Sequence, residues 1–333
     1  MHFPFPVLLC DIGGTNVRVA AAQVPGQAPG PPVHTQTNHH PGLAEALESV
    51  AANLPARARS LIVCAAGPLE GRRLKLTNAE WTIDGPEIAH ALSLEQGLLL
   101  NDFEAQALSL PALLPEWTKE IGAVAKPSGG LQLVLGPGTG LGAAALAEVD
   151  GRFLPLATEM GHTDFGPTDA EEEAIWPHLE RVHGRVTAES VISGPGLVRL
   201  HKARLACRGM VSPETDGVAI VDRALAGEAE EIETVRLFWC LVARLSGDLA
   251  LTFLATGGVS LAGGILPRIV KLLDQADFRR TFEAKAPLEH VARAIPTGVI
   301  TNGAGVLAGM AALAADPDRY ALDYGARCWR APA

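Results

Sequence analysis

The chain has 333 residues, of which 48% are hydrophobic and 19% are charged, so a disordered charged tail is excluded as its main feature. Its 37 acidic residues outnumber its 27 Lys and Arg, and a net charge of -10 suits neither a nucleic-acid backbone nor an anionic membrane surface. The five cysteines form no Cys-x-x-Cys pair, which indicates reduced thiols rather than a disulfide framework or a structural zinc site.

Three uncharged stretches, at 127–147, 249–267 and 294–315, are long enough to be candidate membrane segments. Glycine, threonine and serine divide each of them into apolar runs of strand length, whereas a spanning helix needs about 20 apolar residues. Residues 1–6 lack the basic region and long apolar run of a signal peptide. We therefore expect a cytoplasmic protein with no membrane partner.

The first half of the chain is expected to alternate strands with helices. In chain order, the apolar spacing predicts strands at 7–10 and 17–21, a helix at 43–53, strands at 60–66 and 97–100, and a helix at 103–110. Residues 25–41 are rich in Pro, Gly and His and have no period, so they are expected to form a surface loop.

The second half repeats the opening pattern and then becomes more helical. Strands at 131–135 and 143–149 flank a glycine turn, as the strands at 7–10 and 17–21 do, which suggests two related α/β halves. The later elements are helices at 169–182, 187–191, 196–205, 219–226 and 229–253, a strand at 255–260, and helices at 266–273 and 302–314. This alternation predicts parallel or mixed sheets covered by helices.

The turns at 11–16 and 136–142 are candidate phosphate sites. Consecutive glycines let successive backbone N–H groups point into one concavity that suits an anion. Thr15 adds a hydroxyl, and Asp11, at a strand end, could hold Mg²⁺ directly or through water. Either turn could simply close a hairpin, but Asn-Gly would suffice for that, and two glycine turns suit a polyphosphate. The paired glycines at 257–258 and 263–264 would admit a flat ligand such as adenine and ribose, or only allow a strand to pack on a helix.

Four polar residues are candidates for substrate chemistry. Asn101 and Asp102 follow a strand, where α/β proteins place ligands, and an aspartate there can take a proton from a hydroxyl; the alternative is that they cap the next helix. Glu159 and His162 could form a fork for sugar hydroxyls, and no second His or Cys at ligand spacing supports a metal site.

Taken in order along the chain, these motifs resemble the bacterial glucokinase family of the hexokinase type, within the superfamily of actin, sugar kinases and Hsp70 ATPases. Each segment alone is weak evidence, but the ordered set is specific and spans most of the chain. The matching segments are Asp11–Asn16, Leu76–Asn78 with Trp81, Asn101–Phe103, Gly136–Gly142, Glu159–Phe165, Glu171–Ala174, Ser193–Leu197 and Gly257–Ile265.

The resemblance implies an α/β fold of the two-domain actin/hexokinase-like (ribonuclease H-like) ATPase type with an interdomain cleft. The small α/β domain would comprise residues 1–112 and 301–333, and the large α+β domain residues 113–300. It also implies ATP-dependent phosphorylation of D-glucose to glucose 6-phosphate, the first step of glycolysis, with ATP and Mg²⁺ as cofactors. Members of the family are often homodimers, so a homodimer is expected.

The resemblance also carries residue roles, of which the first is that Asp102 matches the catalytic base. The residues that match glucose-binding positions are Asn78, Asn101, Asp102, Glu159, His162 and Glu189. The residues that match nucleotide-binding positions are Cys10, Asp11, Ile12, Gly13, Gly14, Thr15, Gly138, Thr139, Gly140, Gly257, Gly258, Gly263 and Gly264. Glu189 could instead be only a favourable acidic residue in the first turn of a helix.

Two departures and several rival functions remain open. Cys10 stands where the family often has glycine, and Met160 stands where a second small residue is frequent and could tune the sugar pocket. The related ROK family usually carries a Cys-rich zinc motif, which is missing after His162. The rivals are a kinase for mannose, fructose or an N-acetylhexosamine, a kinase using polyphosphate or ADP, an inactive sugar sensor, and an actin- or Hsp70-like ATPase. Asp102 and the two glycine turns argue against the sensor, and the sugar-type cluster argues against the ATPase.

Overall fold

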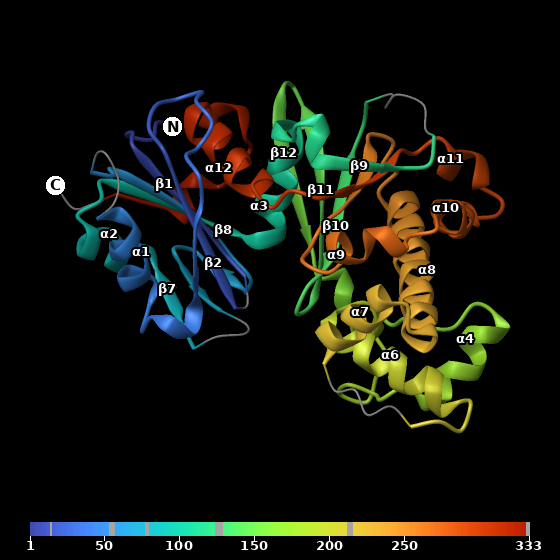
Figure 1. Cartoon of the computed structure of the whole chain (residues 1–333). Helices are drawn as coiled ribbons and strands as arrows, with labels where there is room; N and C mark the ends of the chain where they lie inside the picture. The colour runs from blue at the N-terminus through green and yellow to red at the C-terminus, as the bar shows by residue number, and fades with distance from the viewer. Residues whose placement is uncertain (14, 53–56, 77–79, 124–128, 212–215, 331–333) are drawn as a thin grey trace. The chain divides into compact units, whose positions relative to one another are not determined.

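Two six-stranded sheets organise the chain in the computed structural model, which describes residues 1–13, 15–52, 57–76, 80–123, 129–211 and 216–330 (Figure 1). The chain divides into two units. Unit 1 contains Met1–Trp117, Leu146–Leu156 and Asn302–Ala333, and unit 2 contains Thr118–Ala145 and Ala157–Thr301. The domain boundaries expected above stay a prediction.

The sheet of unit 1 has the strand order β15-β8-β4-β1-β2-β3. Its strands are β1 (Val7–Ile12), β2 (Asn16–Ala22), β3 (Val33–Gln36), β4 (Ser60–Ala65), β8 (Gln96–Asn101) and β15 (Cys328–Arg330). The central strands β1, β4 and β8 are parallel, whereas β2, β3 and β15 run antiparallel to their neighbours. Because parallel strands end at one edge, the residues that follow β1, β4 and β8 are neighbours there.

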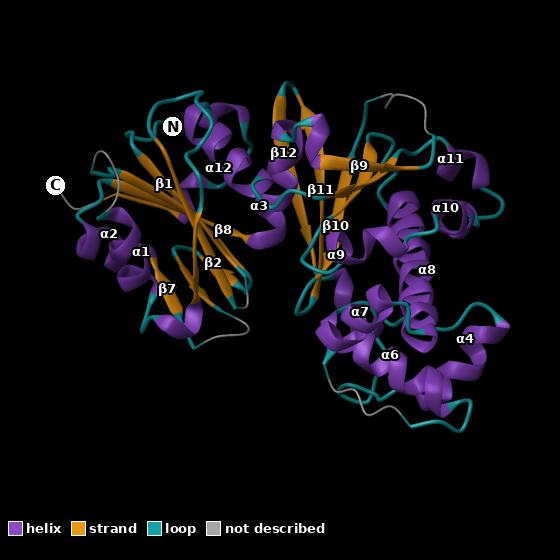
Figure 2. Cartoon of the chain, in the orientation of Figure 1, coloured by secondary structure: helices purple, strands orange, loops and turns teal. Residues whose placement is uncertain are grey.

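Helices cover both faces of this sheet (Figure 2). The helices of unit 1 are α1 (Leu43–Ala51), α2 (Gly85–Leu92), α3 (Asp102–Ser109), α12 (Gly305–Ala315) and α13 (Tyr324–Arg327). Leu8, Cys10 and Ile12 of β1 share a buried core with α1 and α2. Side chains alternate along a strand, so Asp11 points to the other face, where α3 and α12 pack together. The N-terminal part of the chain also contains a small three-stranded sheet of β5 (Leu69–Glu70), β6 (Arg73–Lys75) and β7 (Thr82–Asp84).

The second sheet has the order β12-β11-β10-β13-β14-β9. Its strands are β9 (Thr118–Ile121), β10 (Gln132–Pro137), β11 (Leu141–Val149), β12 (Arg152–Thr158), β13 (Gly258–Leu261) and β14 (Thr297–Ile300). β10, β13 and β14 are parallel, and β9 is antiparallel to β14. The carboxyl ends of β10 and β13 therefore lie side by side.

A long helix, α8 (Ala229–Thr252), forms the centre of the helical part of unit 2. The other helices are α4 (Ala170–Ile175), α5 (Ala188–Val191), α6 (Gly194–Ala206), α7 (Gly217–Ala226), α9 (Leu266–Ile269), α10 (Gln275–Glu283) and α11 (Glu289–Arg293). α8 buries Phe238 and Trp239, and the Trp239 ring lies edge-on to Phe278 of α10 with ring centroids 6.1 Å apart. Within the described residues, none of the helices has both the length and the apolarity that crossing a membrane requires.

Several of the expected elements were wrong in extent; the helix expected at 266–273, for example, ends as α9 at Ile269 and continues as a 3₁₀ turn over Val270–Leu272. Residues 25–41 are not all loop, because β3 pairs with β2 along 33–36; β3 is an exposed edge strand, so it has no apolar pattern that could reveal it. The helix expected at 169–182 ends as α4 at Ile175 and continues only as a 3₁₀ turn over Trp176–His178. Pro177 lacks the N–H that an α-helix needs at that position.

Candidate active site

In unit 1, the carboxyl ends of the parallel strands bring together Asp11 and Asp102, the two acidic residues predicted for the site. Asp11 of β1 is in register with Cys64 of β4, and Cys64 is in register with Leu100 of β8. Asp102 begins α3 two residues after Leu100. Burial raises the pKa of the Cys64 thiol, and the negative charges of Asp11 and Asp102 raise it further. Asp11 and Asp102 thus lie close enough to act on the same thiol.

Asp11 is held by two donors in a mostly buried position. Arg18 Nη1 lies 3.3 Å from Asp11 Oδ2, and the Cys64 thiol donates to Oδ1 at 3.5 Å. The Asp11 side chain is 17% exposed, and burial raises its pKa although Arg18 and Cys64 act in the opposite direction. An ionised Asp11 is therefore incompletely compensated by the protein, a setting that favours the approach of a further cation.

The turn that follows Asp11 offers mainly its backbone. Gly13 N donates to Asn16 O at 2.9 Å, and Thr15 O accepts from Thr37 N at 3.0 Å, so the residue that directly follows β3 supports the turn. Gly13 and Thr15 are exposed, whereas the side chains of Cys10 and Ile12 are buried in the core and leave only their main-chain atoms for a ligand. Gly14 lies outside the described residues, as does Asn78.

Asn101 is the cap of α3, which was the alternative to a role in sugar binding. Its Oδ1 accepts from Phe103 N at 3.0 Å and from Glu104 N at 3.3 Å, while Glu104 Oε2 accepts from Asn101 N at 3.4 Å. This is a reciprocal capping box, and it fixes the first turn of α3, where Asp102 lies. Asn101 Nδ2, 3.5 Å from Gly67 O, is the group of this side chain that could still donate to a ligand.

Two residues that the sequence reasoning missed support this turn. The other carboxylate oxygen of Glu104, Oε1, accepts from Arg327 Nη1, which comes from α13 near the end of the chain. The Glu104 side chain is 6% exposed and that of Arg327 is 28% exposed. A glutamate three residues after Asn101 was the available signal for the capping box, but no local pattern indicates Arg327.

In unit 2, two glycine segments meet at the carboxyl ends of β10 and β13. A Cβ atom at Gly136 would lie 2.4 Å from Ala262, and one at Gly263 would lie 2.3 Å from Pro137 O, so these backbones can touch only because both residues are glycine. Gly138 N donates to Gly140 O at 2.8 Å, and Gly138 O accepts from Gly194 N at 2.8 Å. The turn at 138–140, with Thr139 exposed, and Gly263–Gly264 therefore form one backbone surface.

The structure does not bring Gly257 and Gly258 to that surface. Gly257 precedes β13 and Gly258 is its first residue, so both lie at its amino end, where a Cβ atom at Gly257 would be 2.6 Å from Gly130 O. Gly263 lies beyond the other end of the strand, and a four-residue strand spans about 13 Å. Close packing accounts for these two glycines in the structure, and their place in the nucleotide set stays a prediction.

The remaining predicted sugar residues lie near one another in unit 2. Glu159 follows β12, and its carboxylate Oε2 lies 3.9 Å from His162 Nε2; the two side chains are 89% and 62% exposed. Glu189 lies in α5, whose first residue donates from its backbone N to Thr163 O at 3.0 Å, next to His162. Glu189 Oε2 accepts from Leu141 N at 2.9 Å, which links this cluster to the glycine turn. Met160, between Glu159 and His162 in the sequence, is buried.

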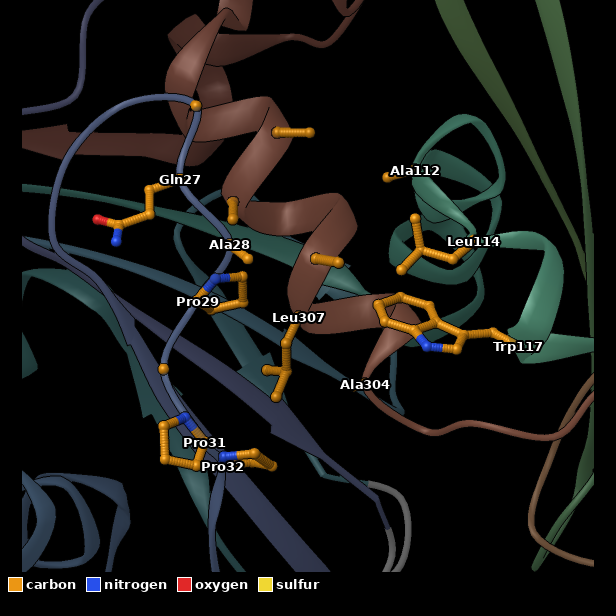
Figure 3. A pocket seen from close by; sticks show the side chains of 15 residues that line it. Gln27, Ala28, Pro29, Pro31, Pro32, Ala112, Leu114, Trp117, Ala304 and Leu307 are labelled. Carbon is orange, nitrogen blue, oxygen red and sulfur yellow. The ribbon is translucent and has the colours of Figure 1, made fainter.

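Two cavities in unit 1 lie along α12. The larger, about 400 Å³, is apolar and lies between α12, the loop that contains Pro29 and Pro31, and the side chains of Leu114 and Trp117 (Figure 3). It contains none of the predicted site residues. The smaller, about 200 Å³, is lined by Arg18, the partner of Asp11, and by His34 and Gly303.

No group of three or more His, Cys, Asp or Glu side chains among the described residues is arranged to hold a metal ion by itself. A Mg²⁺ ion in a phosphoryl-transfer site commonly uses one or two carboxylates and takes its other ligands from substrate phosphates and water. Asp11 fits that more modest requirement.

Comparisons with known proteins agree along the whole chain. The pattern of the family described as Glucokinase matches residues 8–317. The glucokinase of Sinorhizobium medicae strain WSM419 is 38% identical over 330 residues, which cover 98% of this chain and 97% of that protein. The crystal structure of a glucokinase from an Antarctic psychrotroph has a TM-score of 0.81 and 29% identity, and covers 92% of this chain and 98% of its own.

A more distant structure supports the fold. The ROK family glucokinase from Streptomyces griseus, solved in complex with glucose and AMPPNP, has a TM-score of 0.63 at 19% identity over 92% of this chain and 98% of its own. The expected two-domain sugar kinase fold is thereby confirmed. The chain belongs to the glucokinase family.

Proposed function

We propose that this protein transfers the γ-phosphoryl group of ATP to the 6-hydroxyl of D-glucose, giving glucose 6-phosphate and ADP. Membership of the glucokinase family sets the reaction class. The observation that carries the assignment of residues is the strand edge of unit 1, where Asp102 starts α3 beside the row that contains Asp11. A carboxylate for the sugar hydroxyl and a carboxylate for the phosphate end of the nucleotide are both provided there.

Asp102 is the proposed catalytic base. It would orient the 6-hydroxyl and accept its proton as the oxygen attacks the γ-phosphorus and ADP leaves. The transition state spreads charge over the phosphoryl oxygens, so catalysis depends mainly on position and electrostatics. The capping box at Asn101 and Glu104 supports this role, because it fixes the turn from which Asp102 projects.

The other glucose hydroxyls are assigned to Asn101, Glu159, His162 and Glu189. Hydrogen bonds to a charged acceptor contribute about 1.5–3 kcal/mol each, so a sugar with a misplaced hydroxyl would lose affinity by leaving one of these groups unpaired. The family resemblance adds Asn78 to this set. The exposure of Glu159 and His162 supports the proposal, because both are free to reach a ligand.

The phosphates are assigned to two backbone turns, with Gly13, Gly14 and Thr15 in unit 1 and Gly138, Thr139 and Gly140 in unit 2. Backbone N–H groups supply positive potential without adding positive side chains, which explains how a chain of net charge -10 could bind ATP. Gly263 and Gly264 are assigned to the nucleotide because they adjoin the second turn.

Asp11 is assigned to Mg²⁺, directly or through water. Its carboxylate is mostly buried, has a raised pKa because of that burial, and faces only Arg18 and the Cys64 thiol among the donors described for it. When bound, Mg²⁺ neutralises charge on the phosphates. The family resemblance further extends the proposal to a cytoplasmic homodimer, which sedimentation analysis and cell fractionation would test.

The test is a coupled assay of ADP release with Mg-ATP, in the presence and absence of glucose. We expect release to depend on glucose, with one glucose 6-phosphate formed per ADP. Mannose, fructose and N-acetylglucosamine are tested as acceptors through ADP release, and polyphosphate and ADP are tested as donors through the formation of glucose 6-phosphate. A faster reaction with another sugar or donor would reassign the substrate, and equal ADP release without any sugar would overturn the proposal.

A further inference from the structure

The backbone at the end of the glycine turn in unit 2 makes direct contact with Glu189, a residue that is predicted to bind the sugar. Leu141 N donates to Glu189 Oε2 at 2.9 Å, across 48 residues of sequence. Leu141 begins β11 and its side chain is buried, so the strand fixes the direction of this N–H group. On the other side, Ser193 Oγ donates to Glu189 O at 2.8 Å and holds the backbone that carries the carboxylate.

Glycine at position 140 leaves the space that this carboxylate occupies. A Cβ atom at Gly140 would lie 2.6 Å from Glu189 Oε2, which is too close for any real contact. A Cβ atom at Gly166, an exposed residue of the same unit that has no predicted role, would meet nothing within 4 Å. The atom displaced by a larger residue at 140 is the end of a flexible side chain, so the fold would survive while Glu189 moved.

The carbonyl group of Leu141 also lies against the segment that contains Glu159 and His162. A Cβ atom at Gly161, between those residues, would lie 2.3 Å from Leu141 O. The main chain of one residue therefore contacts both predicted sugar segments, through the N–H of Leu141 at Glu189 and through its C=O at Gly161. Because Leu141 N occupies Oε2, the other oxygen of the half-buried Glu189 is left to accept from a sugar hydroxyl.

We propose that the backbone at Gly140 and Leu141 is a positioning element of the glucose site, which sets the affinity for glucose before any nucleotide binds. This inference rests on the proposed role of Glu189 as a glucose ligand. It also makes binding reciprocal: glucose that orders Glu189 orders the turn that binds phosphate, and a nucleotide that orders the turn orders Glu189.

The experiment measures glucose affinity of the full chain by calorimetry without nucleotide, for Gly140→Ala and for the control variant Gly166→Ala. We expect Gly140→Ala to weaken glucose binding about tenfold, as for one hydrogen bond to a charged group. Gly166→Ala should stay within about twofold of the wild type, as surface substitutions do. Thermal unfolding of both variants would verify that they fold.

Glu189→Ala separates this inference from the proposed function. If Glu189→Ala leaves glucose affinity unchanged, Glu189 is not a glucose ligand and the proposed assignment fails. If Glu189→Ala weakens binding but Gly140→Ala equals Gly166→Ala, only the positioning role is overturned. Should Gly140→Ala not fold, Glu189→Asp replaces it: the shorter side chain withdraws the carboxylate from Leu141 N with its charge intact, and wild-type affinity in that variant would overturn the inference.

Discussion

The acidic residues at the ends of the strands differ between the two units in their exposure and in the way they are paired. In unit 1, Asp11 and Glu104 are 17% and 6% exposed, and each is paired with an arginine of the same unit. In unit 2, Glu159 is 89% exposed, and its neighbour His162 is 3.9 Å away and 62% exposed. The first edge is ordered by its own contacts before a ligand arrives, whereas the second keeps hydrated groups that a ligand could recruit.

This difference matches the tasks that the proposal gives to the two edges. A base must be placed to a fraction of an ångström, and an error of about 1 Å can cost about 100-fold in rate. Among the residues assigned to the sugar hydroxyls, Glu189 is fixed by Leu141 N, whereas the exposed Glu159 and His162 need charge and reach more than rigidity. Substitutions in unit 1 should therefore act mainly on kcat, and substitutions at Glu159 mainly on glucose affinity.

Among the substitutions that test this difference between the two units, Asp11→Asn is expected to have the largest effect on kcat. We expect kcat to fall by about 1000-fold, since the carboxylate assigned to the phosphate end is lost. The folded protein should nevertheless be more stable near neutral pH. Burial raises the pKa of Asp11 above its unfolded value, so ionisation of this group costs folding free energy as the pH rises above about 4. Calorimetric unfolding and the coupled assay measure both effects, and a fully active variant would remove Asp11 from the site.

Arg327→Met should have the next largest effect. It leaves Glu104 buried without its cation and loosens the turn that carries Asp102, so we expect kcat to fall about 30-fold while KM for ATP is unchanged. Arg327→Lys should restore part of the rate. Equal losses in kcat and in ATP affinity would indicate general damage to the fold rather than a misplaced base.

Glu159→Ala should weaken glucose binding about tenfold and leave the unfolding temperature unchanged, because this side chain is 89% exposed and its pairing with His162, at 3.9 Å, is an exposed one that contributes little to stability. Calorimetry with glucose gives the affinity. An unchanged affinity would mean that the hydrated edge of unit 2 has no part in sugar recognition.

The smallest effect is expected from Arg59→Met, the control for Arg327→Met. Arg59 pairs with Glu95 at the opposite end of β4 and β8, and both side chains are 51% exposed. Exposed ion pairs contribute little, so rate, affinities and unfolding temperature should match the wild type. A loss like that of Arg327→Met would show that any ion pair on this sheet matters.

Local patterns predicted the parts of this structure that depend on local forces. The buried strands β1, β4 and β8 were visible as apolar runs, and the glycine turns marked places where backbones approach closely. Strand β3 escaped because its pairing with β2 is made by backbone atoms alone. The contacts of Arg327 with Glu104 and of Leu141 with Glu189 escaped because they join residues 223 and 48 positions apart, which only the folded sheet brings together.

The central claim is that Asp102 takes the proton of the glucose hydroxyl, and Asp102→Asn tests it most directly. Turnover in the coupled assay and glucose affinity by calorimetry are measured on the same preparation. We predict that Asp102→Asn binds glucose about as tightly as the wild type and that its kcat is lower by orders of magnitude. Turnover near the wild-type rate in a variant that binds glucose normally would contradict it.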